Sequence, residues 1–262
     1  MKTNEQILYK IFSELKNYGK IVSPRGLKVL EIENYNYELP PYCRFQNFEF
    51  RKLKLDYIKR EFLWYLKGDA TDTSIAERAK MWKNMIKEDG TINSNYGRYI
   101  FGEMNQFHNV ANILFGDKES RKASIVILTP THLKSGDFDT PCTYSINFRI
   151  RDNKLNMTVR MRSQDAIYGM ASDAPCFSFI HEMMYLTLKE SYPELEYGMY
   201  YHSADSFHVY ERHFKMLDEI VNGSEYTEIE CPKIKDAQEV RKLRELDLEG
   251  STYKFTSWLT KL

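Results

Sequence analysis

The stretch DFDTPCTYSINFRIRDNKLNMTVRMRSQDAIYGMASDAPCFSF, residues 137–179, holds the clearest element of the chain. Apolar residues occupy alternate positions on both sides of the dipeptide Asp152-Asn153: Ile146, Phe148 and Ile150 before it, and Leu155, Met157, Val159 and Met161 after it. This alternation, with a turn dipeptide that tolerates positive φ, predicts an antiparallel hairpin with one buried face. Cys142 has the same parity as Ile146, so we expect its side chain on the buried face.

The rest of the chain alternates between helical and strand-like patterns. Apolar spacing predicts helices at residues 7–15, 55–66, 81–86, 173–189 and 211–221, strands at 27–39, 123–130 and 196–210, and a loop at 88–97. In the tail we expect an acidic strand, a charged helix at 235–246 and a final short strand. The order of elements predicts an α+β fold, a mixed β-sheet packed against helices, in a single domain over residues 1–262.

Composition excludes several classes of protein. Lys and Arg total 37, as do Asp and Glu, and the two signs are interspersed, which argues against direct binding of DNA or an anionic membrane by bulk charge. No window approaches the ~18 apolar residues of a membrane span. The four cysteines lie far apart with no CxxC pair, which argues against a zinc knuckle, and a chain of this length does not need a disulfide frame: Cys43, Cys142, Cys176 and Cys231. We therefore expect a soluble cytoplasmic protein with reduced thiols and no metal site.

Cys142 is the first candidate for chemistry, because it follows a proline and opens a strand that would hold a nucleophile rigidly. A lone cysteine in such a place is more often a small buried hydrophobe. Its neighbours favour the nucleophile, since Arg162 and Ser163 end the partner strand of the same hairpin. An arginine beside a cysteine would favour the thiolate and could also bind a phosphate.

Three further side chains could bind a ligand or move protons. His208 and Tyr210 are two apart on a predicted strand, so they share a face and could together bind a hydroxyl group. The alternative is a satisfied core histidine beside a core tyrosine. Glu61 falls on the apolar stripe of the helix at 55–66, where burial would raise its pKa and suit proton transfer unless a basic neighbour pairs with it.

Two charged pairs stay open between a structural and a binding role. Arg121 and Lys122 form a small basic cluster before a strand, which is either solvated surface or a phosphate site. Asp165 and Asp173 bracket the loop YGMAS, and an Asp at a helix start is most often an N-cap. The sequence contains no Gly-rich phosphate loop, no GxSxG and no HExxH.

In their order along the chain these motifs resemble the thymidylate synthase superfamily. The succession is REFLWYLKGD, MWKNM, NSNYG, SRK, Pro141-Cys142, MRSQDAIYG and HVY, and it runs from about residue 56 to residue 214. Within the superfamily the chain is more similar to phage-type deoxycytidylate hydroxymethylases, which contain strings similar to its TINSNYG and SFHVYERHF. The resemblance implies the thymidylate synthase fold and a symmetric homodimer.

The resemblance singles out the fourth residue after Gly169. Thymidylate synthases have Asn there, whereas this chain has Asp173, as the hydroxymethylases do; it also has Thr143 where synthases usually have His. An Asn amide accepts from N3–H of uracil and donates to O4, whereas an ionised carboxylate accepts twice, from the 4-amino group and from a protonated N3 of cytosine. An unpaired buried polar group costs ~1–3 kcal/mol, so cytosine is the expected base.

The implied reaction is hydroxymethylation of deoxycytidylate (dCMP), or of CMP, at C5. The Cys142 thiolate adds to C6, and Asp173 stabilises the charge that appears at N3 and N4. C5 then attacks the methylene of 5,10-methylenetetrahydrofolate, and water adds after tetrahydrofolate departs. Glu61, with Tyr96 and Asn95, is expected to organise that water and move protons. A synthase would deliver hydride instead.

The resemblance also implies binding roles for the remaining candidates. Arg162 and Ser163 would bind the 5'-phosphate, and His208 with Tyr210 the sugar 3'-hydroxyl. Arg121 and Lys122 of the neighbouring subunit would also bind the phosphate, as would Arg25, which occupies the place of the family's N-terminal phosphate loop. The residues expected to contact folate are Asp165, Trp82 and Gly169. The tail TSWLTKL does not match the family's closing segment, and YGMASD lacks the Pro and Phe of LGxPxN.

Two rival interpretations remain. One is a thymidylate synthase or a deoxyuridylate hydroxymethylase on the same fold. The other is a catalytically inactive paralogue that binds a nucleotide or a partner enzyme, although the joint retention of Cys142, Arg162, Glu61, His208 and Tyr210 argues against it. If the protein is phage-encoded, it would work in the host cytoplasm and supply modified phage DNA.

Overall fold

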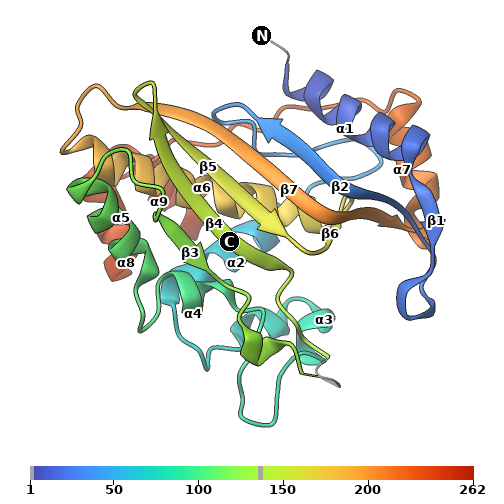
Figure 1. Ribbon diagram of the computed structural model, residues 1–262, viewed down its shortest axis with the longest axis horizontal. Coiled ribbons are helices and arrows are strands. Elements are labelled where there is room, and N and C mark those ends of the chain that lie inside the picture. Colours follow the sequence, from blue (N-terminus) through green and yellow to red (C-terminus); the bar gives the residue numbers. More distant parts are fainter. Residues whose placement is uncertain (1–2, 135–137) are drawn as a thin grey trace.

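The computed structural model describes residues 3–134 and 138–262. Its centre is a mixed sheet of seven strands in the order β1-β2-β7-β5-β4-β3, with β6 paired to β7 (Figure 1). The strands are β1 Lys20–Val22, β2 Val29–Leu39, β3 Ser124–Val126, β4 Thr143–Arg151, β5 Lys154–Met161, β6 Gln164–Asp165 and β7 Glu196–Tyr210. Pairs are antiparallel except that β5 and β6 run parallel to β7. The predicted mixed sheet is confirmed.

The hairpin of β4 and β5 follows the sequence pattern. Its turn residues Asp152 and Asn153 have φ of 48° and 57°, in the left-handed region that Asp and Asn tolerate better than most residues. The side chains of Phe148 and Met157 are buried, whereas Arg149, between Phe148 and Ile150 on β4, is exposed. The hairpin therefore presents one apolar face to the interior and one polar face outward.

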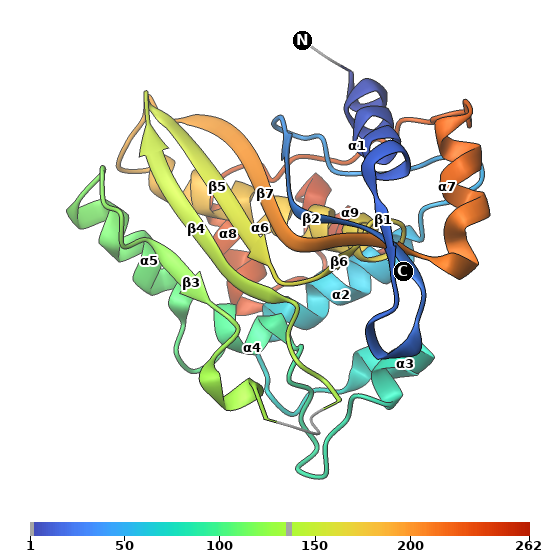
Figure 2. The same ribbon diagram turned by 45° about the vertical axis from the view of Figure 1, so that its right-hand side comes forward.

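Helices pack on the apolar face. They are α1 Asn4–Tyr18, α2 Leu55–Lys67, α3 Lys80–Lys83, α4 Tyr96–Ile100, α5 Gln106–Gly116, α6 Gly169–Lys189, α7 Phe214–Val221, α8 Ala237–Glu245 and α9 Lys254–Thr260. Helix α6 lies behind β4, β5 and β7 with α2, α8 and α9 beside it, while α1 and α7 pair near the β1–β2 end (Figures 1 and 2). In both views the outward face of the β4–β5 hairpin is not covered by any described helix.

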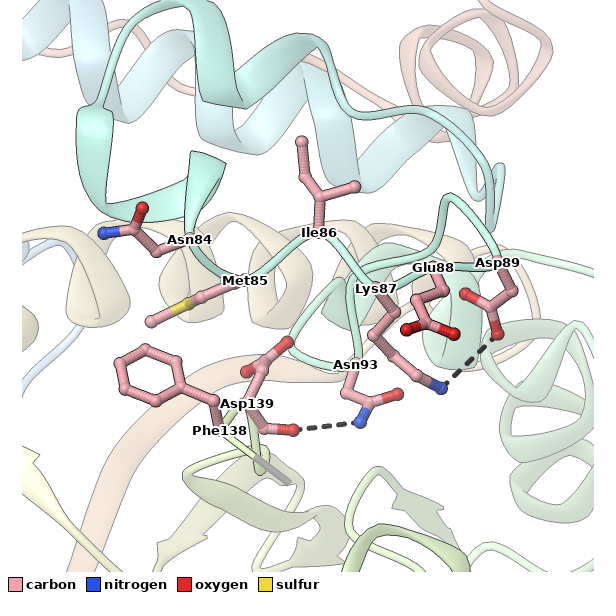
Figure 3. A pocket seen from close by; sticks show the side chains of 9 residues that line it. All are labelled: Asn84, Met85, Ile86, Lys87, Glu88, Asp89, Asn93, Phe138 and Asp139. Carbon is pink, nitrogen blue, oxygen red and sulfur yellow. Dashed lines mark hydrogen bonds and ion pairs between the residues drawn. The ribbon is translucent and has the colours of Figure 1, made fainter. Parts of the chain in front are cut away.

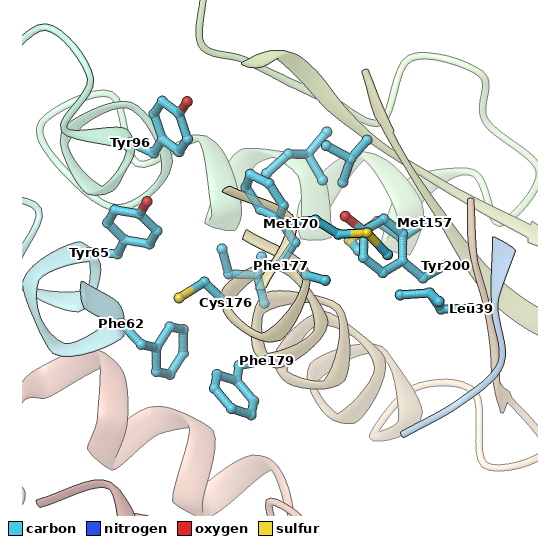
Figure 4. Packing of buried hydrophobic residues seen from close by; sticks show 14 of the residues in the cluster. Leu39, Phe62, Tyr65, Tyr96, Met157, Met170, Cys176, Phe177, Phe179 and Tyr200 are labelled. Carbon is cyan, nitrogen blue, oxygen red and sulfur yellow. The ribbon is translucent and has the colours of Figure 1, made fainter. Parts of the chain in front are cut away.

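The core is organised around α6, whose side chains contact both the sheet and α2 (Figure 4). Phe179 of α6 packs on Phe62 of α2 with ring centroids 5.0 Å apart. Phe177 stacks on Tyr96 of α4 at 6.1 Å. Burying a large apolar side chain contributes roughly 1.5–3 kcal/mol, so these contacts fix α2 and α4 against α6.

A buried ion pair anchors the middle of α6. Arg44 Nη2 bonds to Glu182 Oε2, and both side chains are almost fully buried. Glu182 Oε1 accepts from the Ile234 backbone N–H at 3.1 Å. The Arg44 guanidinium also lies 4.9 Å from the ring centre of Phe179. The charge of Glu182 is therefore compensated inside the core.

The tail corrects two predictions. The charged helix is confirmed as α8, but the expected final strand is wrong, because residues Lys254–Thr260 form helix α9. Phe255 and Leu259 are four apart and both buried, which is helical spacing. The expected acidic strand is also wrong: between Gly223 and Asp236, Tyr226 forms an isolated bridge to Phe48 and no strand is present.

Several boundaries differ from the sequence patterns. The helix predicted at 81–86 is the shorter α3, and the strand predicted at 123–130 is β3 alone, because Pro130 begins a 3-10 turn. The loop predicted at 88–97 ends at Asn95, whose side chain caps α4 by accepting from Arg98 N–H at 3.3 Å. Among the described residues, no helix has the length and apolarity needed to span a bilayer.

Candidate active site

Cys142 lies just before β4, and the expectation that its side chain joins the buried face is confirmed in part, because it packs against the hydrophobic core but stays partly exposed. Tyr144 is an extra residue in β4, because Thr143 pairs with Met161 while Ser145 pairs with Arg160. This bulge reverses the parity at the strand start. Thr143 is therefore fully buried, and Cys142 is only partly buried.

The predicted proximity of Arg162 and Cys142 is confirmed. The Arg162 backbone N–H donates to the Cys142 carbonyl at 2.8 Å. The Arg162 side chain donates through Nε to the Pro141 carbonyl at 3.0 Å and through Nη2 to the Thr140 carbonyl at 2.6 Å. Nη2 also lies 3.6 Å from the Cys142 sulfur. The guanidinium is therefore fixed beside the thiol.

Arg162 favours the thiolate of Cys142, as expected, but burial has the larger effect on the pKa of this thiol. Burial raises the pKa of Cys142 above its usual range, and the nearby acids Asp173 and Asp139 raise it further. The charges of Arg162 and Arg25 lower the pKa but do not compensate. Cys142 is therefore a thiol until a ligand or a proton acceptor changes its surroundings.

Glu61 and Asp173 are two acids that interact with each other, and the charge of Asp173 also acts on Cys142. Glu61 is buried on α2, and its Oε1 accepts from Tyr65 at 3.2 Å and from Tyr57 at 3.4 Å. Burial, together with the charge of Asp173, raises the pKa of Glu61 to about 8. The prediction that Glu61 has a raised pKa is thus confirmed, and its Oε2 makes no hydrogen bond to the described residues.

Asp173 does not cap a helix, because α6 begins four residues earlier at Gly169. The turn before α6 is instead held by Asp165, whose carboxylate accepts from Ile167 N–H at 3.0 Å and Tyr168 N–H at 3.3 Å. Burial raises the pKa of Asp173 to about 7, and the charge of Asp165 adds to this rise. A Cβ built on Gly169 would lie 3.4 Å from Asp165 Cβ and 3.7 Å from Asp173 Oδ2.

Tyr96 and Asn95, predicted as catalytic, have different surroundings. The Tyr96 hydroxyl accepts from the Cys142 backbone N–H at 3.3 Å, which places it at the nucleophile. Asn95 is fully buried and donates to the Asp69 carbonyl at 2.9 Å, while its carbonyl oxygen caps α4. The amide of Asn95 is thus occupied by the fold.

His208, Tyr210 and Arg25 border the same region. The rings of His208 and Tyr210 meet edge to face at 5.1 Å, and His208 pairs across the sheet with Asp165. Burial lowers the pKa of His208, so its imidazole is neutral near pH 7. Arg25 is exposed in a turn with φ of 53°, yet its charge acts on the pKa values of Cys142, His208 and Tyr210. Ser163 follows Arg162 and is partly buried.

Trp82 is buried and donates from its indole N–H to the Tyr57 hydroxyl at 2.9 Å. Because Tyr57 in turn donates to Glu61, Trp82 supports the position of that acid.

Beyond α3 the chain lines a pocket of about 520 Å³ (Figure 3), formed by Asn84, Met85, Ile86, Lys87, Glu88, Asp89, Asn93, Phe138 and Asp139. Asn93 donates to the Asp139 carbonyl at 2.9 Å, just before Pro141-Cys142.

Arg121 and Lys122 are not brought to this site within one protomer. Both are exposed and precede β3, where Ser124 pairs with Asn147. Asn147 lies five residues beyond Cys142 along β4. At the rise of a strand this is roughly 17 Å, so the basic pair lies well away from the thiol.

The sequence patterns missed Gln164 and Tyr37. Gln164 is almost fully buried, and the Tyr37 hydroxyl donates to its Oε1 at 3.1 Å. The only sequence signal was the position of Gln164 inside MRSQD, between two residues already chosen as candidates. Tyr37 gave none, because its partner is 127 residues away.

A thiol beside a guanidinium, with two acids of raised pKa on the neighbouring helices, brings together groups of the kind that covalent catalysis uses. A family model described as thymidylate synthase matches residues 16–259, and the chain belongs to the thymidylate synthase family. The fold and superfamily expected from the sequence motifs are thereby confirmed. The family uses pyrimidine nucleotide monophosphates and methylenetetrahydrofolate as substrates.

Curated relatives include both hydroxymethylases and synthases. The chain is 30% identical to the deoxycytidylate 5-hydroxymethyltransferase of Enterobacteria phage T6, over 82% of this chain and 89% of the relative. It is 27% identical to a thymidylate synthase of Fusobacterium nucleatum, over 74% and 70% of the two chains. It is 26% identical to the deoxyuridylate hydroxymethyltransferase of Bacillus phage SP01, over 90% and 65%.

Proposed function

We propose that this protein is a deoxycytidylate 5-hydroxymethyltransferase, which converts dCMP or CMP, methylenetetrahydrofolate and water into the 5-hydroxymethyl nucleotide and tetrahydrofolate. The observation that carries the proposal is a carboxyl group, Asp173, close enough to Cys142 and to Glu61 for its charge to raise the pKa of each. The likeness to the phage T6 relative supports the same reaction.

The base preference follows from hydrogen-bond donors and acceptors. An ionised Asp173 can accept from the 4-amino group of cytosine and from a protonated N3. Against uracil the same carboxylate would face O4, a second acceptor, with nothing to donate. Leaving that contact unmade costs ~1–3 kcal/mol, which corresponds to a bias of about fivefold to 150-fold toward cytosine.

In the proposed reaction Cys142 is the nucleophile. Its sulfur adds to C6 of the ring, which makes C5 a carbon nucleophile. Arg162 and Ser163 would bind the 5'-phosphate together with Arg25, and His208 with Tyr210 would bind the 3'-hydroxyl. C5 forms a bond to the one-carbon unit of methylenetetrahydrofolate, and the proton on C5 is removed when tetrahydrofolate departs. Water then adds to the exocyclic methylene, and the electron pair returned to C5 re-forms the C5–C6 double bond and expels the sulfur, which regenerates Cys142 as a thiolate.

Glu61 is the proposed proton carrier. Its pKa of about 8 leaves it largely protonated at neutral pH, and its Oε2 is free of hydrogen bonds to the described residues. A carboxyl group with a pKa near the working pH can both give and take a proton. We propose that Glu61 and Tyr96 orient the water that becomes the hydroxyl of the product, with Asn95 holding the α4 start in place.

The pocket beyond α3 fits a folate. Met85, Ile86 and Phe138 give it apolar walls, and Lys87 supplies a cation for a carboxylate tail. We propose that Asp165, Gly169 and the wall supported by Trp82 complete this binding region. When bound, methylenetetrahydrofolate supplies the one-carbon unit. Lys87 already forms an ion pair with Asp89 at 3.4 Å, which a ligand carboxylate would have to replace.

We also propose a homodimer that forms through the outward face of the sheet. Arg149, Arg160 and Asp205 give this face a mixed charge, and the described helices leave it uncovered. Arg121 and Lys122 would then reach the phosphate bound by the partner subunit.

Subunit mixing tests the shared site. Arg121→Ala and Cys142→Ser homodimers should each be impaired, but mixed dimers should regain activity, because one site then has both Cys142 and a partner Arg121. The lack of any recovery would contradict the shared site.

The four free thiols fit a reducing cytoplasm, where we place the protein.

The product identifies the reaction. The protein is incubated with methylenetetrahydrofolate and either dCMP, CMP or dUMP, and the products are resolved by mass. A 5-hydroxymethyl product from the cytidine nucleotide is expected. A 5-methyl product would identify a synthase, a uridylate preference would exclude the proposed role of Asp173, and the absence of all turnover with retained nucleotide binding would identify an inactive paralogue.

A further inference from the structure

Gln164 is almost fully buried and its amide orientation is fixed. Its Oε1 accepts from the Tyr37 hydroxyl at 3.1 Å, so the amino end of the amide must point the other way. Tyr37 is itself immobilised, because its ring stacks on His202 with centroids 4.6 Å apart and an interplanar angle of 7°. The backbone of Gln164 is held by pairing of β6 with Phe207 of β7.

The amino end of Gln164 is a buried donor in need of an acceptor. Its Nε2 makes no hydrogen bond within normal distance of the described residues. Leaving such a donor unmet is unfavourable, so a nearby acceptor should attract it. Asp173 is a nearby acceptor, because a Cβ built on Gly169 would lie 3.7 Å from Asp173 Oδ2 and 3.4 Å from the Cβ of Asp165, the residue next to Gln164. The Gln164 side chain lowers the pKa of the Asp173 carboxyl against the effect of burial, although the two side chains are farther apart than a normal hydrogen bond.

We propose that Gln164, oriented by Tyr37, is a positioning residue that directs the Asp173 carboxylate toward the edge of the base and so determines the preference for cytosine over uracil. This inference rests on the proposed function. Gln164 need not touch the reacting atoms, because it acts through Asp173.

Gln164 is the group that favours the ionised form of Asp173, because the other groups around this carboxyl do not. Those that share its electrostatic environment are acids or neutral groups: Asp165 of β6, Glu61, Tyr57 and Tyr65 of α2, Tyr96 of α4, Cys142, Cys176 of α6, Tyr37 of β2 and Tyr200 of β7. A negative charge on any of them disfavours ionisation of Asp173. The cations Arg162 and Arg25 act on the Cys142 thiol nearby.

Ionisation matters because a neutral acid does not discriminate between the bases. A protonated carboxyl group has one donor and one acceptor, so it can pair with N3 and the 4-substituent of either cytosine or uracil. The ionised group accepts twice and fits protonated cytosine alone. Loss of the Gln164 donor should therefore weaken selectivity and move its pH dependence to higher pH.

The test uses Gln164→Leu and Tyr37→Phe, with Tyr35→Phe as the matched control. The Tyr35 hydroxyl lies on the same strand but donates to Glu14 at 2.6 Å. The ratio of kcat/KM for dCMP to that for dUMP is measured across pH. We expect Gln164→Leu to lower the ratio about tenfold near neutral pH, Tyr37→Phe to lower it less, and Tyr35→Phe to leave it unchanged.

A second measurement separates this inference from the proposed function. The titration of Asp173 is followed in the nucleotide-free protein by NMR of carboxyl-labelled aspartate, with Asp173→Asn for assignment. The pKa of Asp173 should rise in Gln164→Leu and in Tyr37→Phe. If both the selectivity profile and this titration match the wild type, the inference is overturned even when dCMP is the substrate. A wild type that prefers dUMP would overturn the proposed function, while the titration still decides whether Gln164 acts on Asp173. If Gln164→Leu does not fold, Tyr37→Phe decides.

Discussion

The Nη2 atom of Arg162 lies 3.6 Å from the sulfur of Cys142, and the backbone of Arg162 is hydrogen-bonded to the Cys142 carbonyl at 2.8 Å. The backbone bond keeps Arg162 beside Cys142, and the side-chain bonds to the Pro141 and Thr140 carbonyls keep the guanidinium beside the thiol. Since burial still raises the pKa of Cys142, the charge of Arg162 limits this rise without abolishing it. The reactivity of the thiol should depend on that charge.

Two replacements of Arg162 should separate the effect of its positive charge from the effect of its hydrogen-bonding geometry. Arg162→Gln removes the cation, so the pKa of Cys142 should rise and its alkylation by iodoacetamide should require higher pH. Arg162→Lys keeps a cation but cannot donate to both the Thr140 and Pro141 carbonyls, so the alkylation profile should change less while the KM for nucleotide increases about tenfold or more. Peptide mapping reports Cys142 specifically. Identical profiles for the wild type and Arg162→Gln would contradict the expected effect of the charge.

Asp173→Asn should reverse the base preference. The amide can accept from N3–H of uracil and donate to O4, so the ratio of kcat/KM for dUMP to that for dCMP should increase at least about tenfold. Asp205→Asn is the control, because Asp205 accepts from Tyr144 on the outward face at 2.7 Å. An unchanged ratio in Asp173→Asn would show that another group selects the base.

Glu61→Gln should stabilise the protein most at high pH. The usual pKa of 4.5 rises to about 8 on folding, so between these values the unfolded chain releases a proton that the folded chain retains. Stability from this group is present below about pH 4.5 and is lost as the pH rises, by roughly 1.4 kcal/mol for each pH unit. The gain in free energy of unfolding from Glu61→Gln should therefore be larger at about pH 8 than at about pH 5. Urea unfolding measures this, with the exposed Glu245→Gln as control; a gain independent of pH would contradict it.

The Arg44–Glu182 pair gives a prediction about stability alone. Arg44→Met leaves the Glu182 carboxylate buried without its cation and should lower the free energy of unfolding by about 3–5 kcal/mol. Arg44→Met combined with Glu182→Leu removes both charges and should recover most of that loss. A double variant less stable than the single variant would show that Glu182 stabilises α6 mainly through its bond to Ile234.

Local patterns predicted the parts of the fold that local physics determines. The β4–β5 hairpin has period-two alternation and a turn dipeptide suited to positive φ, and it was predicted correctly. The full burial of Thr143 was not predicted, because a bulge at Tyr144 adds a residue that alternation cannot reveal, and Cys142 packs against the core while staying partly exposed. Helix α9 was mistaken for a strand because its burial depends on Phe179, 76 residues earlier than Phe255 in the sequence.

In the candidate site, as in the fold, the sequence predicted the features that depend on neighbouring residues and missed those that depend on distant ones. The raised pKa of Glu61 followed from its place on an apolar stripe, which is a local signal. The link between Tyr37 and Gln164 could not be predicted, because it joins residues 127 positions apart through the pairing of β2 and β6 with β7. Arg121 and Lys122 lie away from the site of their own protomer, so their proposed role depends on the partner subunit.

Trapping with 5-fluoro-dCMP tests most directly whether Cys142 attacks C6 of a cytosine nucleotide. Fluorine at C5 cannot leave as a proton, so the covalent complex should persist when methylenetetrahydrofolate is present. Intact mass should increase by both ligands, peptide mapping should place them on Cys142, and Cys142→Ser should form no complex. A complex that forms with 5-fluoro-dUMP but not with 5-fluoro-dCMP, or an adduct on another residue, would contradict the proposed reaction.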